Sequence, residues 1–373
     1  MRVAVMKRMI CGYQMPYYLL LNDRLKHKNI ELKVFCGTTQ DAGYIYADTF
    51  FKRLPKMEFN VRIGGLQEKL VILPSLFSAL VKYRPDVIVA EDISAMPNCI
   101  TVLFYCKLFK IPYIVWGPGS IPKKKPSRMR IFLEPVIASF RSGSQNILCY
   151  SSYAEDYYST KYGKRCYIAY NSAISRHLPA EYSEIEANIG VKYKNSEPFN
   201  LVFIGRLMPQ KRVDLLLAAL SKINRPVTLF IIGEGNIKNS LLEMTQKLNI
   251  ADRVCFMGEI SEHSRKRKIF MNAHLGILPG LGGLAIQEMM WYGIPVIATS
   301  ADGTEQDLIV KSKAGIYIND MDENRLSDAI QSFVNMPYES KTSMALNALK
   351  VVYEKYNMDS MLDAFEKAIL AAN

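Results

Sequence analysis

The stretch of sequence that decides the fold is GILPGLGGLAIQEMMWYGIP, residues 276–295. Its apolar beginning predicts a strand that ends at Pro279, and its second half predicts a helix over 284–292. The turn between them contains three glycines, Gly280, Gly282 and Gly283. The N–H groups of a first helical turn have no partner inside the helix, and the helix dipole favours negative charge there. A glycine-rich turn of this kind therefore suits an anion such as phosphate.

Glu288 lies one turn inside the predicted helix, on the same face as Leu284. A carboxylate at that depth is too far in to cap the helix, but it can reach a sugar hydroxyl beside a bound phosphate. The alternative is an ordinary strand, turn and helix with a surface glutamate, because a glycine motif on its own has low specificity.

A second stretch, NLVFIGRLMPQKRVDLLLAAL at residues 200–220, has the same organisation. A strand predicted over 201–204 ends at Gly205, Arg206 follows directly, and Lys211 lies five residues further on. Open α/β sheets bind ligands beyond the carboxyl ends of their strands, where an arginine and a lysine can neutralise a diphosphate. Two phosphate-suited turns in one predicted domain argue against a mere surface Arg–Lys pair.

Together these motifs resemble the retaining glycosyltransferases of family 4, which have the GT-B fold of two Rossmann-like domains. The resemblance rests on four motifs in this order: Gly205-Arg206-Leu207 with Lys211, Ile232-Gly233-Glu234-Gly235, Phe256-Met257-Gly258, and the block from Gly283 to Pro295. It implies that Arg206 and Lys211 hold the diphosphate of a nucleotide sugar, and that Glu288 holds its ribose. The backbone from Gly258 to Ile260 would line the base.

The turn before the helix departs from the family's pattern. The family usually carries a second glutamate eight residues before the counterpart of Glu288, where it contacts the transferred sugar, and this sequence has Gly280 there. Backbone N–H groups remain available to the sugar, so we expect four residues of the turn to line the donor site: Gly280, Gly282, Gly283 and Leu284. The replacement bears on the identity of the donor sugar and on activity.

Length and composition indicate a globular protein of two domains. The chain has 373 residues, of which 49% are hydrophobic and 22% are charged. We expect no signal peptide and no membrane-spanning helix, since Lys107 and Lys110 interrupt the best candidate, residues 100–116. The seven scattered cysteines lack a CxxC pair and suit a reducing cytoplasm, and the four histidines lack a metal-ligand spacing.

The net charge of +12 is confined to the first half of the chain. Residues 1–175 contain 25 Lys and Arg against 12 Asp and Glu, whereas the remaining residues contain 22 against 23. Such a field favours an anionic partner, which could be a membrane, a nucleic acid or an acidic polymer. The sequence has no zinc-finger, RNP-like or KH-like motif, so nucleic acid is disfavoured.

Strand and helix patterns alternate through residues 1–175, which predicts a doubly wound parallel sheet. Strands are predicted over 3–6, 32–36, 86–90, 112–116 and 146–150, helices over 16–28 and 71–83, and a helix cap at Ser151-Ser152.

The acidic pair Glu91 and Asp92 and the first strand–helix turn, Gly12 and Tyr13, are the candidate site residues of this half. They follow predicted strands, so they would face the ligand-binding edge of the sheet. The resemblance implies a histidine or an acid of this region near the reaction centre, where a carboxylate would orient or partly deprotonate an acceptor hydroxyl. For the acidic pair, a loop cap or a salt bridge is the alternative.

One basic and apolar segment predicts where an anionic membrane would bind. Lys123-Lys124-Lys125-Pro126-Ser127-Arg128-Met129-Arg130 precedes Ile131-Phe132-Leu133 and Val136-Ile137. Basic residues beside a short apolar stripe are typical of membrane-surface elements. The alternative is a solvated loop before a core helix, since Glu134-Pro135 interrupts the stripe.

The pattern becomes polar between about residues 175 and 198, where we place the interdomain linker. Further strands are predicted over 228–232, 253–257, 275–278, 295–299 and 315–318, and further helices over 213–220, 237–248, 323–334, 342–355 and 360–371. Gly233-Glu234-Gly235 lacks the rest of a dinucleotide fingerprint, which argues against a dehydrogenase. We expect an acceptor-binding domain over 1–175, a nucleotide-sugar domain over 176–355 and a last helix, 356–373, that packs back on the first domain.

The sequence thus predicts an α/β protein of two doubly wound domains facing each other across a cleft, and the resemblance implies a metal-independent, retaining glycosyltransferase. Its donor would be a UDP- or GDP-sugar. Its acceptor would be a glycan or lipid-linked glycan of polysaccharide, lipopolysaccharide or capsule biosynthesis, at the cytoplasmic face of the inner membrane. No cofactor is expected, because Arg206, Lys211 and the helix N-terminus can stabilise the leaving diphosphate.

Two other functions stay open. The first is a GT-B pseudoenzyme that binds a nucleotide sugar without transferring it, an interpretation that Gly280 motivates. The second is a nucleotide-sugar epimerase, which would act on the donor alone and would have no use for a basic first domain.

Overall fold

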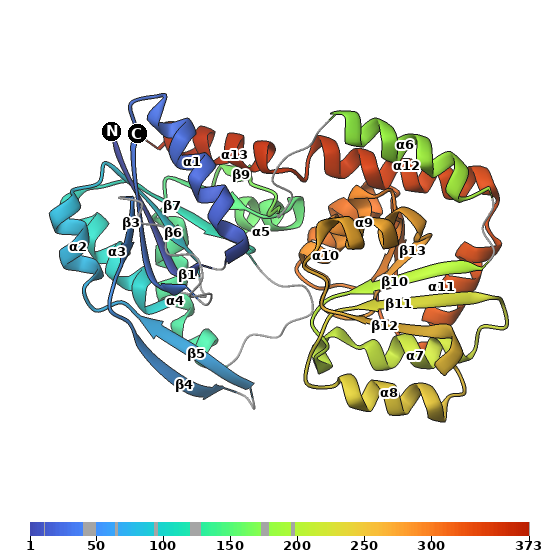
Figure 1. The fold of residues 1–373 in the computed structure, drawn as a ribbon. Coiled ribbons are helices and arrows are strands. Elements are labelled where there is room, and N and C mark those ends of the chain that lie inside the picture. The colour runs from blue at the N-terminus through green and yellow to red at the C-terminus, as the bar shows by residue number, and fades with distance from the viewer. Residues whose placement is uncertain are drawn as a thin grey trace. The chain divides into compact units, whose positions relative to one another are not determined.

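A computed structural model describes residues 1–10, 12–39, 50–63, 66–92, 96–119, 128–172, 179–194 and 198–372. The chain forms two compact α/β units (Figure 1), of which unit 1 comprises Met1–Ser175 and Met358–Asn373, and unit 2 comprises Arg176–Asn357. Each unit has its own parallel sheet with helices on both faces. None of the helices in these described ranges is long and apolar enough to span a bilayer.

Unit 1 is built around a seven-stranded sheet with the strand order β3-β2-β1-β6-β7-β8-β9. Its strands are β1 (Arg2–Ile10), β2 (Glu31–Thr39), β3 (Phe51–Arg53), β6 (Val87–Glu91), β7 (Tyr113–Gly117), β8 (Asn146–Cys149) and β9 (Cys166–Ile168). The central strands are continuous apolar runs, such as Val87-Ile88-Val89-Ala90, whose side chains are fully buried. Such runs are expected where helices cover both faces, and all five strands predicted for this half are confirmed.

Helices form two layers on this sheet. One face carries α1 (Met15–Lys26) and α13 (Met358–Leu370), and the other carries α2 (Leu76–Tyr83), α3 (Met96–Phe109), α4 (Arg128–Ser142) and α5 (Ser152–Tyr162). The last helix of the chain, α13, returns to unit 1, where the ring of Phe365 meets that of Trp116 at 4.7 Å. Asn146 Nδ2 also donates to the Ala368 carbonyl at 3.0 Å. Ser151 caps α5, as predicted.

One prediction for unit 1 is wrong in part. The helix predicted over 71–83 begins only at Leu76, because residues 71 and 72 end β5 (Leu66–Ile72), which pairs antiparallel with β4 (Met57–Ile63). The long-range pairing of this hairpin overrides the local helical pattern. Pro135, which interrupts the apolar stripe in the sequence, lies inside α4, and the helix continues through it. Pro135 is exposed, so the carbonyl group that loses its helical N–H partner lies on the solvent side.

Unit 2 contains a six-stranded sheet with the order β12-β11-β10-β13-β14-β15. Its strands are β10 (Phe199–Ile204), β11 (Val227–Ile232), β12 (Val254–Gly258), β13 (Leu275–Leu278), β14 (Val296–Ala298) and β15 (Gly315–Tyr317). The strand order reverses between β10 and β13, so the chain leaves these neighbours in opposite directions. Such a topological switch point is where open α/β sheets bind ligands.

The helices of unit 2 are α6 (Pro179–Lys192), α7 (Val213–Ser221), α8 (Lys238–Lys247), α9 (His263–Asn272), α10 (Leu284–Trp291), α11 (Glu323–Asn335) and α12 (Tyr338–Glu354). The linker predicted over 175–198 is wrong in its central part, because α6 occupies it. Ile185 and Ile189 of α6 are fully buried, and the helix packs on α9 and α12. Charged and polar residues separate the apolar positions of this segment, and this pattern was too weak to predict a helix.

Candidate functional site

The carboxyl edge of the unit 2 sheet brings together the two glycine turns found in the sequence. β10 and β13 are hydrogen-bonded neighbours, with Val202 opposite Gly276. The turn after β10 begins at Gly205 and contains the short helix η3 (Pro209–Lys211). The turn after β13 runs from Pro279 to Gly283 and leads into α10. Because both turns leave the switch point, they form one potential ligand-binding edge.

Backbone contacts hold these two turns together. The Leu281 N–H donates to the Gln210 carbonyl at 3.1 Å, and the Lys211 ammonium donates to the carbonyls of Leu281 and Gly282. A Cβ on Gly280 would lie 2.2 Å from the Gln210 oxygen. In this arrangement position 280 has room for glycine alone.

The turns that follow β10 and β11 also contact each other through their backbones. The Leu207 N–H donates to the Glu234 carbonyl at 2.8 Å. A Cβ on Gly233 would lie 2.0 Å from the Gly205 oxygen, and one on Gly235 would lie 2.0 Å from the Leu207 oxygen. The two glycines of the Gly233-Glu234-Gly235 motif therefore allow neighbouring backbone turns to touch.

The helix α10 begins with a glycine at its N-cap. Gly283 has φ 65° and ψ −142°, and no side chain caps the first turn. A Cβ on Gly282 would lie 2.9 Å from Ile286 Cδ1, so packing also restricts that position. Leu284, the first helical residue, is partly exposed. The first-turn N–H groups of α10 therefore lie at the edge where the two turns meet, as an anion site requires.

The three charged side chains predicted to bind the donor belong to this edge. Arg206 is exposed. Lys211 is partly buried, and burial lowers the pKa of its ammonium from the ordinary lysine value, a cost that a bound anion would offset. Glu288 forms an ion pair of 2.7 Å with Lys266 of α9, and its side chain is 37% exposed. Sequence reasoning missed Lys266, because a single lysine in a charged helix carries no motif.

The turn after β12 completes the edge. Gly258 has φ 70°, and its carbonyl accepts from the Gly233 N–H at 2.8 Å. Oε1 of Glu234 lies 3.2 Å from the position of a Gly258 Cβ, and this carboxylate pairs with Lys238 at 2.6 Å. Ile260 is 6% exposed, so a ligand here would meet the backbone of this turn more than its side chains.

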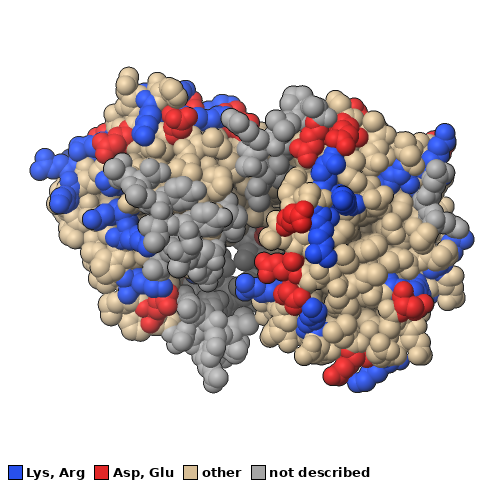
Figure 2. Space-filling model, in the orientation of Figure 1, with Lys and Arg blue, Asp and Glu red and all other residues tan. Residues whose placement is uncertain are grey.

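Charges of both signs surround this part of unit 2. In Figure 2, acidic and basic side chains alternate over the region where Figure 1 shows α9 and α10. Lys266 of α9 and Glu288 of α10 form an ion pair between these two helices. The surface is therefore mixed in sign, and its preference for an anion depends on the local arrangement of Arg206, Lys211 and the α10 N-terminus.

The switch point of unit 1 lies between β1 and β6 and carries Glu91. The two carboxylate oxygens of Glu91 accept hydrogen bonds from Lys7 Nζ and from the Arg8 N–H, both at 3.0 Å. Burial alone would raise the pKa of Glu91, but the Lys7 charge and the Arg8 N–H lower it below the ordinary value. Lys7 is itself buried and lies over the Trp116 ring at 4.2 Å. Glu91 is thus an ionised, paired carboxylate, and its catalytic role stays a prediction.

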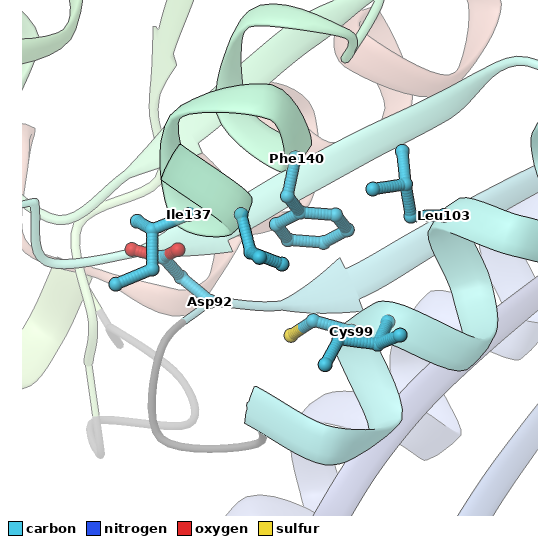
Figure 3. Close-up of a pocket in the computed structure, with 7 residues that line it drawn as sticks. Asp92, Cys99, Leu103, Ile137 and Phe140 are labelled. Atoms are coloured by element: carbon cyan, nitrogen blue, oxygen red, sulfur yellow. The ribbon is translucent and has the colours of Figure 1, made fainter. Parts of the chain in front are cut away.

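Asp92 lies inside unit 1, beside a small cavity (Figure 3). Its carboxylate accepts from Arg141 Nε at 3.2 Å and Nη2 at 2.7 Å, and from the Tyr158 hydroxyl at 2.8 Å. The side chains of Asp92 and Arg141 are 3% and 0% exposed. The cavity between α3 and α4 is otherwise apolar, with Cys99, Ile137 and Phe140 among its lining residues. This environment suits a buried ion pair that links β6 to α4 and α5, and catalysis by Asp92 stays a prediction.

Several predicted residues are described in part or not at all. Gly12 begins the short helix η1 (Gly12–Gln14) and is partly exposed, but the side chain of Tyr13 lies outside the described residues. Lys123, Lys124 and Lys125 also lie outside them. Within the described ranges, no group of three or more His, Cys, Asp or Glu side chains could hold a metal ion.

The match to a protein-family model lies within unit 2. Residues 184–351 match the family model described as "Glycosyl transferases group 1". An uncharacterized glycosyltransferase of Methanocaldococcus jannaschii is 26% identical over 166 residues, which is 43% of this chain and 42% of that protein. The GDP-mannose-dependent alpha-(1-6)-phosphatidylinositol monomannoside mannosyltransferase of Mycobacterium tuberculosis is 25% identical over 214 residues, which is 52% of this chain and 54% of that protein. The chain thus aligns with about half the length of these relatives.

The fold has close structural neighbours. The crystal structure of HepE from Anabaena in complex with UDP covers 100% of this chain and 100% of its own, with a TM-score of 0.68 and 14% sequence identity. At that identity the likeness shows the fold alone, which is the predicted GT-B fold of two Rossmann-like halves. The family match and the names of the relatives support a glycosyltransferase with this fold.

Proposed function

We propose that this protein transfers a sugar from a nucleotide-diphosphate sugar to a glycan or lipid-linked glycan, with retention of anomeric configuration and without a metal ion or other cofactor. The observation that carries the proposal is the switch point of unit 2, where Arg206, Lys211 and the first turn of α10 belong to one edge. The mycobacterial relative is named for GDP-mannose and a phosphatidylinositol mannoside, and HepE was solved with UDP. These names support a UDP- or GDP-sugar donor and an acceptor that is a glycan or a lipid-linked glycan.

In the proposed sugar transfer this edge must stabilise the leaving diphosphate. The bond from the anomeric carbon to the diphosphate oxygen breaks, a bond to the acceptor oxygen forms, and the acceptor hydroxyl loses its proton. Arg206 can bind the growing negative charge with its planar fork and Lys211 as a point charge, together with the N–H groups of α10. Lys211 is already partly removed from water, so its attraction to the diphosphate is stronger than in bulk solvent.

Glu288 would bind the ribose hydroxyls. An ionised carboxylate accepts hydrogen bonds from two vicinal hydroxyls, and the ion pair with Lys266 holds the carboxylate in place. On the acceptor side, Glu91 has more exposed surface than Asp92, at 14% against 3%. We assign to Glu91 the orientation of the acceptor hydroxyl, and to Asp92 a positioning role through its ion pair with Arg141.

A second candidate function, binding of a nucleotide sugar without transfer, is favoured by one observation. The place where the family's glutamate would contact the sugar holds Gly280, and the Gln210 carbonyl occupies the space that a side chain would need. Turnover of the bound donor distinguishes this candidate from the enzyme.

Binding of UDP and GDP to three variants tests the donor site. Arg206→Ala and Lys211→Ala should each weaken binding by about 1.5–3 kcal/mol, the scale of a charged hydrogen bond, or roughly 10- to 150-fold. Arg212→Ala is the matched control, because Arg212 is exposed and pairs with Asp214 at 3.4 Å. Calorimetry that gives unchanged affinity in folded Arg206 and Lys211 variants would contradict the assignment.

Product analysis tests the reaction itself. Release of UDP or GDP from a panel of nucleotide sugars, dependent on added glycan or lipid-linked glycan and unaffected by a chelator, is the expected result. Donor binding without release would support the pseudoenzyme, and conversion of the donor sugar without acceptor would support the epimerase. Activity that a chelator abolishes and magnesium or manganese restores would overturn metal independence.

We also propose that the protein works at an anionic membrane surface. The first-half excess of positive charge supports this, and so does the start of α4, where Ile131 is 60% exposed and Phe132 is 83% exposed. These exposed apolar side chains belong to the segment in which the sequence predicts shallow insertion. Their exposure is less compatible with the alternative of an ordinary core helix.

A further inference from the structure

The outward face of α3 is apolar, although a surface helix is normally polar on its solvent side. Among its 14 residues the only charged side chain is that of Lys107. Ile100, Phe104 and Leu108 are 45%, 60% and 57% exposed. Because these residues are four apart, they form one stripe about 12 Å long on the helix surface. A helix that is apolar on both sides is normally buried, so this stripe indicates a contact with another surface.

The helix α2 extends the stripe sideways. Phe77 of α2 contacts the rings of Phe104 and Phe109, with centroids 5.9 and 6.5 Å apart. Phe109 is 46% exposed and Val81 of α2 is 39% exposed. We call the five exposed apolar residues of the two helices the docking face: Val81, Ile100, Phe104, Leu108 and Phe109. The exposed start of α4 belongs to the same helical layer.

Apolar exposure is concentrated in this layer. The part of the chain that the structure describes has 14 exposed large hydrophobic side chains. Seven of them belong to α2, α3 and the start of α4: Val81, Ile100, Phe104, Leu108, Phe109, Ile131 and Phe132. Scattered exposed apolar residues need no explanation, but a cluster of this kind marks an interaction surface.

The exposed charges that accompany the docking face are predominantly basic. Four exposed basic residues lie on or next to α2 and α3: Lys82, Arg84, Lys107 and Lys110. Residues 73–111 contain three acids. Glu91 and Asp92 form ion pairs inside unit 1, whereas Asp86 is exposed and accepts from the Arg2 N–H. A partner that fits this surface must therefore combine an apolar interior with negative charges at its boundary.

We propose that the docking face binds an anionic lipid bilayer, with its apolar side chains at the acyl-chain boundary and its basic residues at the headgroup phosphates. Lysine side chains suit this position, because their stems can lie along apolar surface while the ammonium reaches the phosphates. A second copy of the chain is disfavoured, since a two-fold interface would set the basic residues against one another. The proposal deepens the membrane part of the proposed function, and it does not depend on sugar transfer.

Vesicle co-sedimentation of the full chain tests the docking face. The wild-type protein should bind vesicles of phosphatidylcholine and phosphatidylglycerol more tightly than vesicles of phosphatidylcholine alone, and added salt should weaken this binding. Lys107→Gln with Lys110→Gln should weaken it about 30-fold, which corresponds to about 1 kcal/mol for each basic residue. Phe104→Ser with Leu108→Ser should lower binding to both kinds of vesicle.

Matched controls change the same chemistry in unit 2. Lys247→Gln with Lys355→Gln removes two exposed lysines, and Leu242→Ser removes a leucine that is 40% exposed. Neither control should change vesicle binding. The proposal would be overturned if the wild-type protein bound neither kind of vesicle. It would also be overturned if the controls lost vesicle binding as much as the docking-face variants. A wild-type dimer that Phe104→Ser with Leu108→Ser converts to a monomer would overturn it too, because the occupant would then be a second copy.

Calorimetry with UDP and GDP on the same preparations separates this inference from the proposed function. Vesicle binding by a protein that binds neither nucleotide would leave the docking face in place and remove the donor site. Sugar transfer to a soluble glycan by a protein that does not bind vesicles would support the donor site and overturn the docking face.

Discussion

Replacement of Gly280 by alanine tests whether the two turns of the candidate donor site must touch. The alanine Cβ would lie 2.2 Å from the Gln210 oxygen and 2.8 Å from the Lys211 carbonyl carbon. Real Cβ atoms essentially never approach other heavy atoms within 3.0 Å. Because both neighbours are backbone atoms, no flexible side chain can move aside, and the turns themselves must separate.

Separation of the turns has a cost that can be estimated. Overpacking of this kind costs about 1–3 kcal/mol, and loss of the hydrogen bond from Leu281 to Gln210 adds about 1 kcal/mol. We expect the free energy of unfolding to fall by about 2–4 kcal/mol in Gly280→Ala. The Lys211 ammonium, which donates to the carbonyls of Leu281 and Gly282, would also shift. Its displacement should weaken UDP or GDP binding about ten-fold, because roughly one charged hydrogen bond is lost.

Urea unfolding and calorimetry with UDP and GDP measure the two effects. Gly190→Ala is the matched control, since the nearest atom to its Cβ would be the Tyr338 hydroxyl at 3.9 Å. Gly190 lies within α6, where alanine is the better helix former by about 1 kcal/mol, so the control should be at least as stable as the wild type. Gly280→Ala protein with wild-type stability and wild-type nucleotide affinity would refute the steric argument.

Three further predictions follow from buried or paired charges. Burial lowers the pKa of the Lys192 ammonium from 10.5 to about 7. Between pH 7 and pH 10.5 the unfolded chain therefore binds this proton more strongly than the folded chain. The free energy of unfolding of the wild type should rise as the pH rises through this range. Lys192→Met should be more stable than wild type at pH 7 and should flatten that rise in thermal scans, and a wild-type curve without the rise would contradict the burial argument. Asp92→Asn should lower the free energy of unfolding by about 3–5 kcal/mol, because Arg141 would stay buried without its carboxylate; unaltered urea unfolding would exclude a structural ion pair. Glu288→Gln should weaken nucleotide binding in calorimetry, and a nucleotide-bound crystal structure with Glu288 turned away from the ribose would contradict its role.

The secondary structure near the candidate donor site was predictable because its signals are local. The strand predicted over 275–278 coincides with β13, and the helix predicted from Leu284 ends one residue later than α10. Glycine turns and apolar runs mark these elements within a few residues. The elements that sequence reasoning missed are held by distant partners. β5 pairs with β4, and α6 becomes a core helix only because Ile185 and Ile189 meet other helices of unit 2.

By itself the sequence determined the class of fold, the positions of the glycine turns and the cations that follow them. Only the tertiary structure decided which of these parts are neighbours. It placed β13 beside β10, brought Arg141 to Asp92 across 49 residues, and paired Lys266 with Glu288 across 22 residues. The physical reason is that an apolar period of two or 3.6 residues records which side of an element is buried, but not what covers it. Strand order, close backbone contact and ion pairing depend on that second surface.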